Sequence, residues 1–280
     1  MSNVLIDPRA EPFLPRKGAR KREDIPPEVL QGLNEGWLST VNLTEWLAVD
    51  MATLLRAVLC QTSLNDLVDE LGSIADSIAD QGVMQRVEHI GRALYAACRE
   101  REDGPELLQT LATHPADVVR NWATFALVAA PSRSLADRLM IVRPFAADTH
   151  FGVRECAWMA VRPALMVELE TSLALLQPWV VDADLNVRRF AIEGTRPRGV
   201  WCSHITTFKE QPELGLPLLE PVRADPERYV QLSVANWLND ASKSTPDWVR
   251  AVCERWQHES PVKETKWITN HALRTLRKQT

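Results

Sequence analysis

A short motif recurs along this chain at a fixed interval: an aliphatic residue, usually followed by arginine, with a small residue one helical turn later. The first three copies begin at Val119, Val153 and Val187, so successive copies are 34 residues apart. Fainter copies follow at Val230 and Ile268. A period of this size is typical of stacked helical repeats, in which each helix pair buries its apolar face against its neighbours. The sequence therefore predicts an all-α fold, arranged as a right-handed α-solenoid.

Equivalent positions of successive repeats line up along one face of such an array. Arg120, Arg154 and Arg188 directly follow the first three valines, and we expect them to form a ladder on one surface of the solenoid. The net charge of the chain is −5, yet residues 181–280 hold 15 basic and 13 acidic residues. An anionic ligand would therefore meet a local basic strip, because the protein as a whole is not basic.

Composition divides the chain into three regions. Residues 1–24 contain several prolines and a basic run from Arg16 to Arg22 with little periodicity, which predicts an extended basic N-terminal arm. Residues 25–104 are dense in apolar residues at helical spacing and predict an N-terminal helical region. The clear repeats occupy residues 105–280, and we expect them to form one continuous solenoid with residues 25–104.

The residues present disfavour several classes of function. The five cysteines are widely spaced without a CxxC pair, and the six histidines lack a metal-ligand spacing such as HExxH. No glycine-rich phosphate loop is present either, so we expect neither a metal nor a cofactor. No apolar run approaches the roughly 18 residues of a membrane span, and the N-terminus lacks the apolar core of a signal peptide. These features predict a monomeric cytoplasmic protein with no membrane partner.

Two segments are more specific than a helical repeat requires. The first runs from Glu193 to Trp201 (EGTRPRGVW) and the second from Ser233 to Lys243 (SVANWLNDASK). Both resemble segments of the bacterial DNA alkylation repair proteins built from HEAT-like repeats, the AlkC/AlkD superfamily. The first segment is closer to the AlkC branch. The resemblance covers roughly residues 105–278.

This resemblance implies a solenoid of HEAT-like repeats whose concave face grips duplex DNA through the phosphate backbone. It also implies a DNA glycosylase, which hydrolyses the bond between deoxyribose and a cationic alkylated base such as 3-methyladenine. Such enzymes act without flipping the base into a deep pocket, unlike most enzymes that modify bases. The partner would be duplex DNA carrying alkylated bases, and the protein would associate with the nucleoid while acting.

The residues present suit this chemistry. A cationic base is already a good leaving group, so the site needs a carboxylate to stabilise the developing sugar cation and an aromatic face beside it. The candidate catalytic acids are Glu155, which is three residues before Trp158 on a repeat helix, and Glu193, which precedes Gly194 at a helix end. A structural alternative is open for both: Glu155 could pair with neighbouring arginines, and Glu193 could hold Arg196.

Arginine suits phosphate because its planar guanidinium donates paired hydrogen bonds. The expected DNA-binding residues are Arg120, Arg154, Arg188, Arg189, Arg196, Arg198, Lys243 and Lys266. The expected aromatic contacts are Trp122, Trp158 and Trp201, for each of which a place in the core is the alternative.

The sequence also departs from the pattern of its relatives. In AlkD-type sites a Trp is followed by Asp one turn later, whereas Trp158 is followed by Arg162 and Trp122 by an alanine. Asn121 stands where a carboxylate would otherwise lie beside Glu155 on the adjoining repeat. Two alternatives to a glycosylase follow: a non-catalytic repeat protein that binds damaged or branched DNA, and a scaffold that binds a protein partner.

Overall fold

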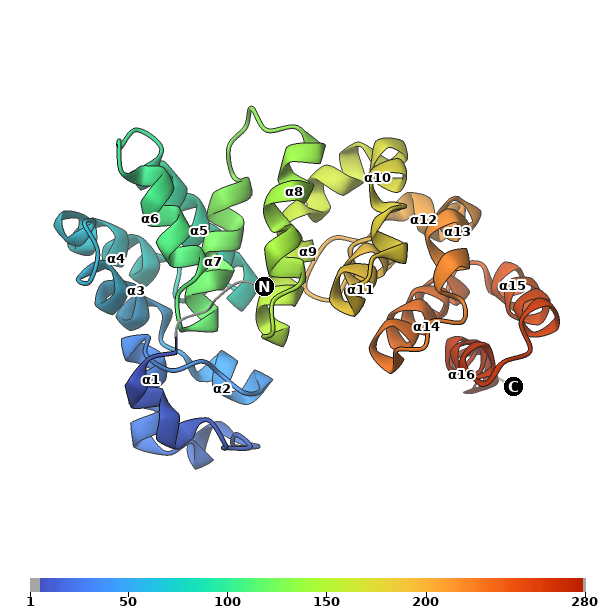
Figure 1. Cartoon of the computed structure of the whole chain (residues 1–280), viewed down its shortest axis with the longest axis horizontal. Helices are drawn as coiled ribbons and strands as arrows, with labels where there is room; N and C mark the ends of the chain where they lie inside the picture. Colours follow the sequence, from blue (N-terminus) through green and yellow to red (C-terminus); the bar gives the residue numbers. More distant parts are fainter. Residues whose placement is uncertain (1–5, 279–280) are drawn as a thin grey trace. The chain divides into compact units, whose positions relative to one another are not determined.

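The structure, a computed structural model, describes residues 6–278. About 70% of the chain is helical, and residues 6–278 contain no β-strand (Figure 1). The expected all-α fold is therefore confirmed. The chain forms two compact units, one made of Met1–Arg133 with Asp148–Ala160 and the other of Ser134–Ala147 with Val161–Thr280.

The first unit contains the N-terminal helices. They are α1 (Pro27–Glu35), α2 (Leu43–Ala48), α3 (Met51–Leu59), α4 (Val68–Ser77), α5 (Val83–Cys98), α6 (Gly104–Ala112) and α7 (Asp117–Val128), followed by the start of α9 (Phe151–Val167). Helices α5 and α6 both pack on α7. The boundary expected between residues 104 and 105 consequently falls inside one compact unit.

The second unit contains the later repeats. Its helices are α8 (Leu135–Ala146), the end of α9, α10 (Leu169–Leu176), α11 (Leu185–Gly194), α12 (Thr206–Glu210), α13 (Leu216–Leu219), α14 (Arg228–Ser242), α15 (Pro246–Glu259) and α16 (Lys263–Ala272). Helix α14 packs between α11 and α16. These three helices carry the later copies of the recurring motif.

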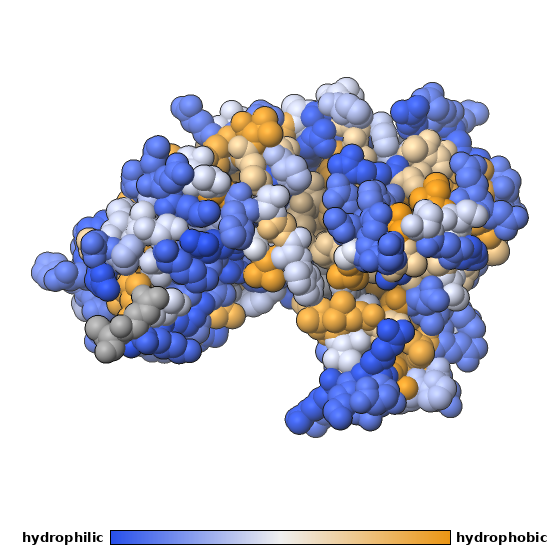
Figure 2. Space-filling view, turned by 180° about the vertical axis from the view of Figure 1, so that it is seen from behind, coloured by the Kyte–Doolittle hydropathy of each residue, from blue (hydrophilic) through white to orange (hydrophobic). Residues whose placement is uncertain are grey.

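The recurring motif builds the core of both units. The motif valines are fully buried, and so are the small residues one turn later, Ala123, Ala157 and Ala191. A small side chain at that position lets neighbouring helices approach closely, so the repeat encodes helix packing. Apolar side chains are thereby removed from the surface, and Figure 2 shows a face covered mainly by hydrophilic side chains with small apolar groups between them.

The N-terminal segment is folded, which corrects the expectation of an extended arm. Residues Pro8–Phe13 and Arg22–Asp24 form 3₁₀ helices, and Ala10 is buried. The Arg16 guanidinium donates to both oxygens of the buried Glu45 carboxylate, at 3.1 and 2.8 Å, and to the Ser39 carbonyl. One residue of the basic run, Arg16, therefore forms an ion pair inside the protein. Residues 1–5 of the expected arm lie outside the described residues.

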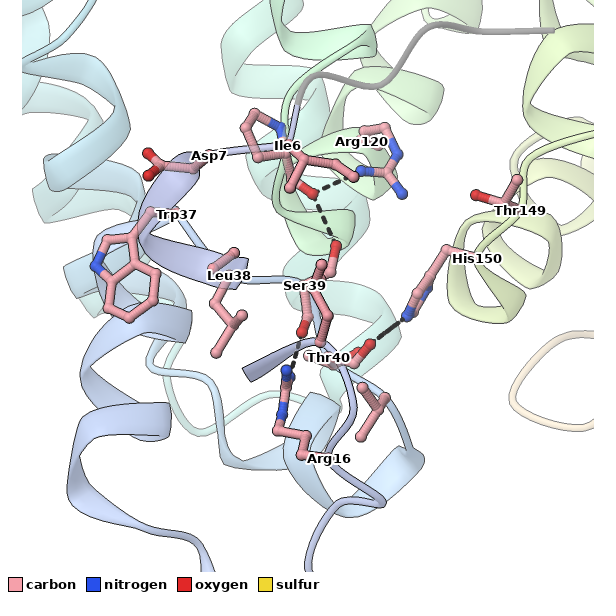
Figure 3. A pocket seen from close by; sticks show the side chains of 14 residues that line it. Ile6, Asp7, Arg16, Trp37, Leu38, Ser39, Thr40, Arg120, Thr149 and His150 are labelled. Carbon is pink, nitrogen blue, oxygen red and sulfur yellow. Dashed lines mark hydrogen bonds between the residues drawn. The ribbon is translucent and has the colours of Figure 1, made fainter. Parts of the chain in front are cut away.

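A buried polar network ties the segment around residue 40 to two repeat helices. The carboxylate of Asp117 at the start of α7 accepts hydrogen bonds from the Thr40 N–H (2.8 Å) and hydroxyl (2.9 Å). His150, just before α9, donates through Nε2 to the Thr40 carbonyl at 2.7 Å (Figure 3). A cavity of about 380 Å³ lies beside this network, and its lining includes Ser39, Thr40, Arg120 and His150 (Figure 3).

Arg120 is buried, with 2% of its surface exposed. Its Nη1 donates to the carbonyls of His114 (2.7 Å) and Pro115 (2.8 Å) in the turn before α7. Its Nε and Nη2 donate to the Asp148 carboxylate, at 3.0 and 3.3 Å. Carbonyls ahead of a helix have no partner inside that helix, and Arg120 supplies their donor.

The same hydrogen bonds recur one repeat at a time. Arg154 donates to the carbonyls six and five residues before it, at 2.7 and 2.8 Å, and Arg188 does the same at 2.9 and 3.2 Å. Arg188 also pairs with the Asp225 carboxylate at 2.7 Å. Where arginine is absent, the Gln231 side chain donates to the Asp225 carbonyl six residues earlier at 2.7 Å. We call this arrangement the turn clamp.

The turn clamp corrects the expected surface ladder. Arg120 is not available to DNA, and the Arg188 guanidinium is engaged by two carbonyls and a carboxylate in the second unit. The physical reason is proximity, because the carbonyls of the preceding turn lie within reach of the side chain that follows the motif valine. A DNA contact by the half-buried Arg154 stays a prediction.

Replacement of Arg120 by methionine is expected to destabilise the protein by about 3–5 kcal/mol, because Asp148 becomes a buried charge without a partner. The urea concentration at the unfolding midpoint measures this effect. Arg250→Ala is the control, because Arg250 pairs with Asp247 at an exposed site where ion pairs contribute little. Equal unfolding midpoints for the two variants would contradict a stabilising role for the clamp.

Candidate functional site

The predicted acid Glu155 lies on α9 beside an indole. Glu155 is half-buried, and one of its carboxylate oxygens accepts a hydrogen bond from the Trp158 indole N–H at 3.0 Å. Trp158 itself is buried, so the packed ring fixes the position of the carboxylate. The first unit thus contains a partly accessible carboxylate held by an indole, and the catalytic role of Glu155 stays a prediction.

Asn121 on α7 supplies no second acid. Its side chain is fully buried and, with the amide oriented to satisfy its neighbours, donates to the Asp117 carbonyl (3.1 Å) and accepts from the Trp46 indole N–H (3.0 Å). Trp46 of α2 is therefore part of the surroundings of α7, which its apolar spacing alone did not indicate. An amide here holds two elements together without carrying a negative charge.

Glu193, the other predicted acid, is a buried anion in the second unit. It is 3% exposed, and its Oε1 accepts from the Ser233 hydroxyl at 2.7 Å. Its Oε2 accepts from Arg196 at 3.1 Å, and Arg189 lies 3.6 Å from Oε1. Burial favours the neutral acid, but the positive charges of Arg189 and Arg196 outweigh it and lower the pKa of Glu193. This geometry matches the structural alternative for Glu193, with both oxygens engaged inside the protein.

The Glu193 ion pair continues into a chain of alternating charges. Arg196 also donates to Asp240 of α14 at 2.7 and 2.9 Å, and Asp240 in turn accepts from Lys243 at 3.1 Å. Burial acts to lower the pKa of Arg196, but the carboxylates of Glu193 and Asp240 raise it overall. Arg196 therefore links Glu193 of α11 to Asp240 of α14, and a phosphate contact by this half-buried residue stays a prediction.

Arg162 of α9 holds the segment after α11. This buried guanidinium donates to the carbonyls of Gly194 (2.8 Å), Arg196 (2.7 Å) and Ser203 (3.0 Å). Burial lowers the pKa of Arg162. Arg162 thus organises the loop that follows the EGTRPR segment.

Two arginines of the second unit lie flat on aromatic rings. The Arg189 guanidinium is 4.2 Å from the centre of the Tyr229 ring, and Arg228 is 3.9 Å from that of Trp267. Trp267 stacks in turn on His271 at 4.9 Å. The sequence analysis missed Arg228, Tyr229 and Trp267, because such pairs join residues about 40 positions apart and have no local spacing to reveal them.

The remaining predicted cations differ in accessibility. Arg198 is half-buried and donates to the Asp240 carbonyl (3.2 Å) and the Ser244 hydroxyl (2.8 Å). Lys243 and Lys266 are exposed. Arg228 at the start of α14 is exposed as well.

The three tryptophans predicted to contact DNA differ in their exposure to solvent. Trp122 has no exposed surface and belongs to the core of the first unit, so its assignment as a DNA contact is wrong. Trp158 is buried and bonds to Glu155. Trp201 is 52% exposed, in the loop that Arg162 holds.

Two general properties of the described residues bear on the class of site. Residues 6–278 include no helix whose length and apolar character would let it cross a membrane. Over the same range, no three His, Cys, Asp or Glu side chains are grouped so that they could hold a metal ion.

The sequence of this chain is similar to one protein family and to one curated protein. Residues 153–276, from α9 to the end of the chain's repeats, match the family described as DNA alkylation repair enzyme. The uncharacterized protein YhaZ of Bacillus subtilis is 43% identical over 120 residues, which are 43% of this chain and 33% of YhaZ. The family match, over residues 153–276, includes Glu155 and the EGTRPR segment.

Solved structures point to the same class. The alkylpurine DNA glycosylase AlkC of Pseudomonas fluorescens, solved bound to DNA containing an abasic site analog, is 27% identical with a TM-score of 0.65. The alignment covers 80% of this chain and 61% of AlkC. AlkD2 of Streptococcus mutans shares the fold at 20% identity, with a TM-score of 0.56 over 73% of this chain and 96% of AlkD2. The predicted resemblance to the AlkC/AlkD superfamily is confirmed, and the chain spans only a third of YhaZ and 61% of AlkC.

The ion pairs of Glu193 predict a particular dependence of stability on pH. A carboxyl whose pKa is lowered by folding stabilises the protein above its ordinary pKa of 4.5, and this contribution disappears as the pH falls through the lowered value. Glu193→Gln should therefore cost on the order of 3 kcal/mol at pH 7 and progressively less below pH 4.5. Urea unfolding of both proteins across this range measures the difference, and a gap that widens toward acid would refute the assignment.

Proposed function

We propose that this protein binds duplex DNA and removes cationic alkylated bases by hydrolysing the N-glycosidic bond. The observation that carries the proposal is the Glu155 carboxylate, half-buried and positioned by the Trp158 indole within the region similar to DNA alkylation repair enzymes. An acid fixed by a buried ring is preorganised toward developing positive charge. The similarity to AlkC supports the choice of substrate class.

The reaction requires few catalytic groups. The bond between sugar C1′ and the base nitrogen breaks, and its electron pair leaves with the base and neutralises the base's positive charge. The sugar becomes an oxocarbenium-like cation, which the Glu155 carboxylate stabilises. Water then adds to C1′ and loses a proton, with Glu155 as the acceptor. Glu193 takes no part in this step, since its two oxygens bond to Ser233 and Arg196.

The phosphate contacts of the proposal come from residues outside the recurring motif. Lys243 and Lys266 are exposed, and Arg198 and Arg228 are positioned by Ser244 and Trp267. The turn clamp uses Arg120 and Arg188 internally and removes them from this set. Backbone contacts of this kind position DNA without reading its sequence.

A second candidate function is DNA binding without catalysis. Asn121 favours it, because position 121 holds a fully buried amide, bonded to the Trp46 indole and the Asp117 carbonyl, where a second carboxylate was expected beside Glu155. Recognition would then rest on the shape or deformability of damaged or branched duplexes. A protein-binding scaffold becomes the remaining explanation if the purified protein has no affinity for DNA at low salt.

Glu155→Gln is expected to lower the rate of 3-methyladenine release from methylated duplex DNA by about 100-fold or more, because the amide cannot stabilise the sugar cation. Release of free base, measured by chromatography, follows the reaction. The matched control is Glu170→Gln at an exposed position of α10, which should behave as wild type. Binding of DNA with no base release by wild-type protein would favour the non-catalytic alternative.

Replacement of Lys243 and Lys266 together by alanine should flatten the salt dependence of duplex binding. Each phosphate contact contributes about 0.9 to the slope of log affinity against log salt, so the double variant should lose roughly two of these contributions. Fluorescence anisotropy with an unmodified duplex at several salt concentrations provides the slope. Arg92→Ala on α5, at an exposed ion pair with Glu88, serves as the control, and an unchanged slope in the double variant would remove these lysines from the interface.

A further inference from the structure

Trp201 combines three unusual properties. It is the one tryptophan classed as exposed within residues 6–278, with 52% of its surface accessible, and the adjacent Val200 is 57% exposed. Its backbone has φ of 62°, and it is the one non-glycine residue in the described range with a positive φ. A bulky side chain in this region is a genuine outlier, and such strain persists only where the surroundings impose it.

The surroundings of Trp201 impose this conformation from both ends of the loop. The Ile205 N–H donates to the Pro197 carbonyl at 3.0 Å and closes the loop at its base. Arg162 binds the carbonyls of Arg196 and Ser203 on the two sides of the loop. A buried charge with three carbonyl acceptors is a costly anchor for a surface loop, and its effect is to present Val200 and Trp201 outward.

We propose that Val200 and Trp201 form an apolar wedge that inserts between base pairs of duplex DNA. The proposal rests on the proposed function and adds a mode of contact to it. Apolar side chains that enter the base stack partly unstack it and kink the duplex. An indole has the flat π surface that stacks on any base, so a wedge of this kind is independent of sequence.

Duplex DNA is the occupant that the charges around the loop favour. Arg198 lies at the start of the loop, and its guanidinium is held by the Asp240 carbonyl and the Ser244 hydroxyl. Arg198 precedes the exposed Trp201 by three residues, so one short segment offers both a cation for phosphate and an aromatic surface for stacking on a base. A position where stacking is already weakened, such as an abasic gap, costs least to enter.

The variant Trp201→Gly tests whether the Trp201 indole inserts into DNA or only packs within the protein. Glycine adopts positive φ without strain, so the variant removes the indole and the backbone strain together. A wedge predicts that Trp201→Gly melts at an equal or higher temperature than wild type and yet binds about tenfold more weakly to a duplex with a central abasic analog. It also predicts loss of the kink, seen as reduced energy transfer between dyes at the two ends of that duplex.

Two further variants complete the test. Trp201→Phe keeps an aromatic wedge and should retain most of the affinity and energy transfer, whereas Val181→Ala, an exposed valine of the same unit, should match wild type. A lower melting temperature for Trp201→Gly, or unchanged binding and energy transfer, would overturn the wedge and leave the proposed function standing. Failure of the wild-type protein to bind the abasic duplex or an unmodified one would overturn both.

Discussion

The hydrogen bonds of the turn clamp are the interaction on which the repeat architecture depends. In each case the side chain after the motif valine supplies donors to carbonyls that precede its own helix. One aspartate then joins two repeats, because the Asp148 carboxylate binds Arg120 while its carbonyl accepts from Arg154. Gln231 makes the equivalent bond without a charge. The donor, and not the positive charge, is therefore what the helix entry requires.

This use of arginine changes where an anion can bind. An arginine whose guanidinium already binds two carbonyls and a carboxylate, as in Arg120 and Arg188, is a poor phosphate ligand, since a new contact has to replace these bonds inside the protein. The same reasoning applies to Glu193, whose carboxylate is held by Ser233 and Arg196. Glu155 differs because it remains partly accessible beside a buried indole. Because it is both accessible and fixed in position, Glu155 is the better candidate of the two predicted catalytic acids.

The sequence predicted what depends on local periodicity. The motif valines and alanines are buried as the 34-residue period indicated. Periodicity does not show whether the next side chain turns toward solvent or back onto its own turn, and this is why Arg120 was misplaced. The fold of the N-terminal segment depends on Arg16 meeting Glu45, 29 residues away, and no local pattern contains that pairing.

The loop after α11 depends on one side chain of α9. Arg162 lies one turn after Trp158, and its guanidinium donates to the carbonyls of Gly194, Arg196 and Ser203. An aspartate at that position could not hold those carbonyls, because it has no hydrogen to donate when ionised. The loop would lose its anchor, and the strained conformation of Trp201 would relax. The buried charge of Arg162 therefore determines the conformation in which this loop exposes Trp201.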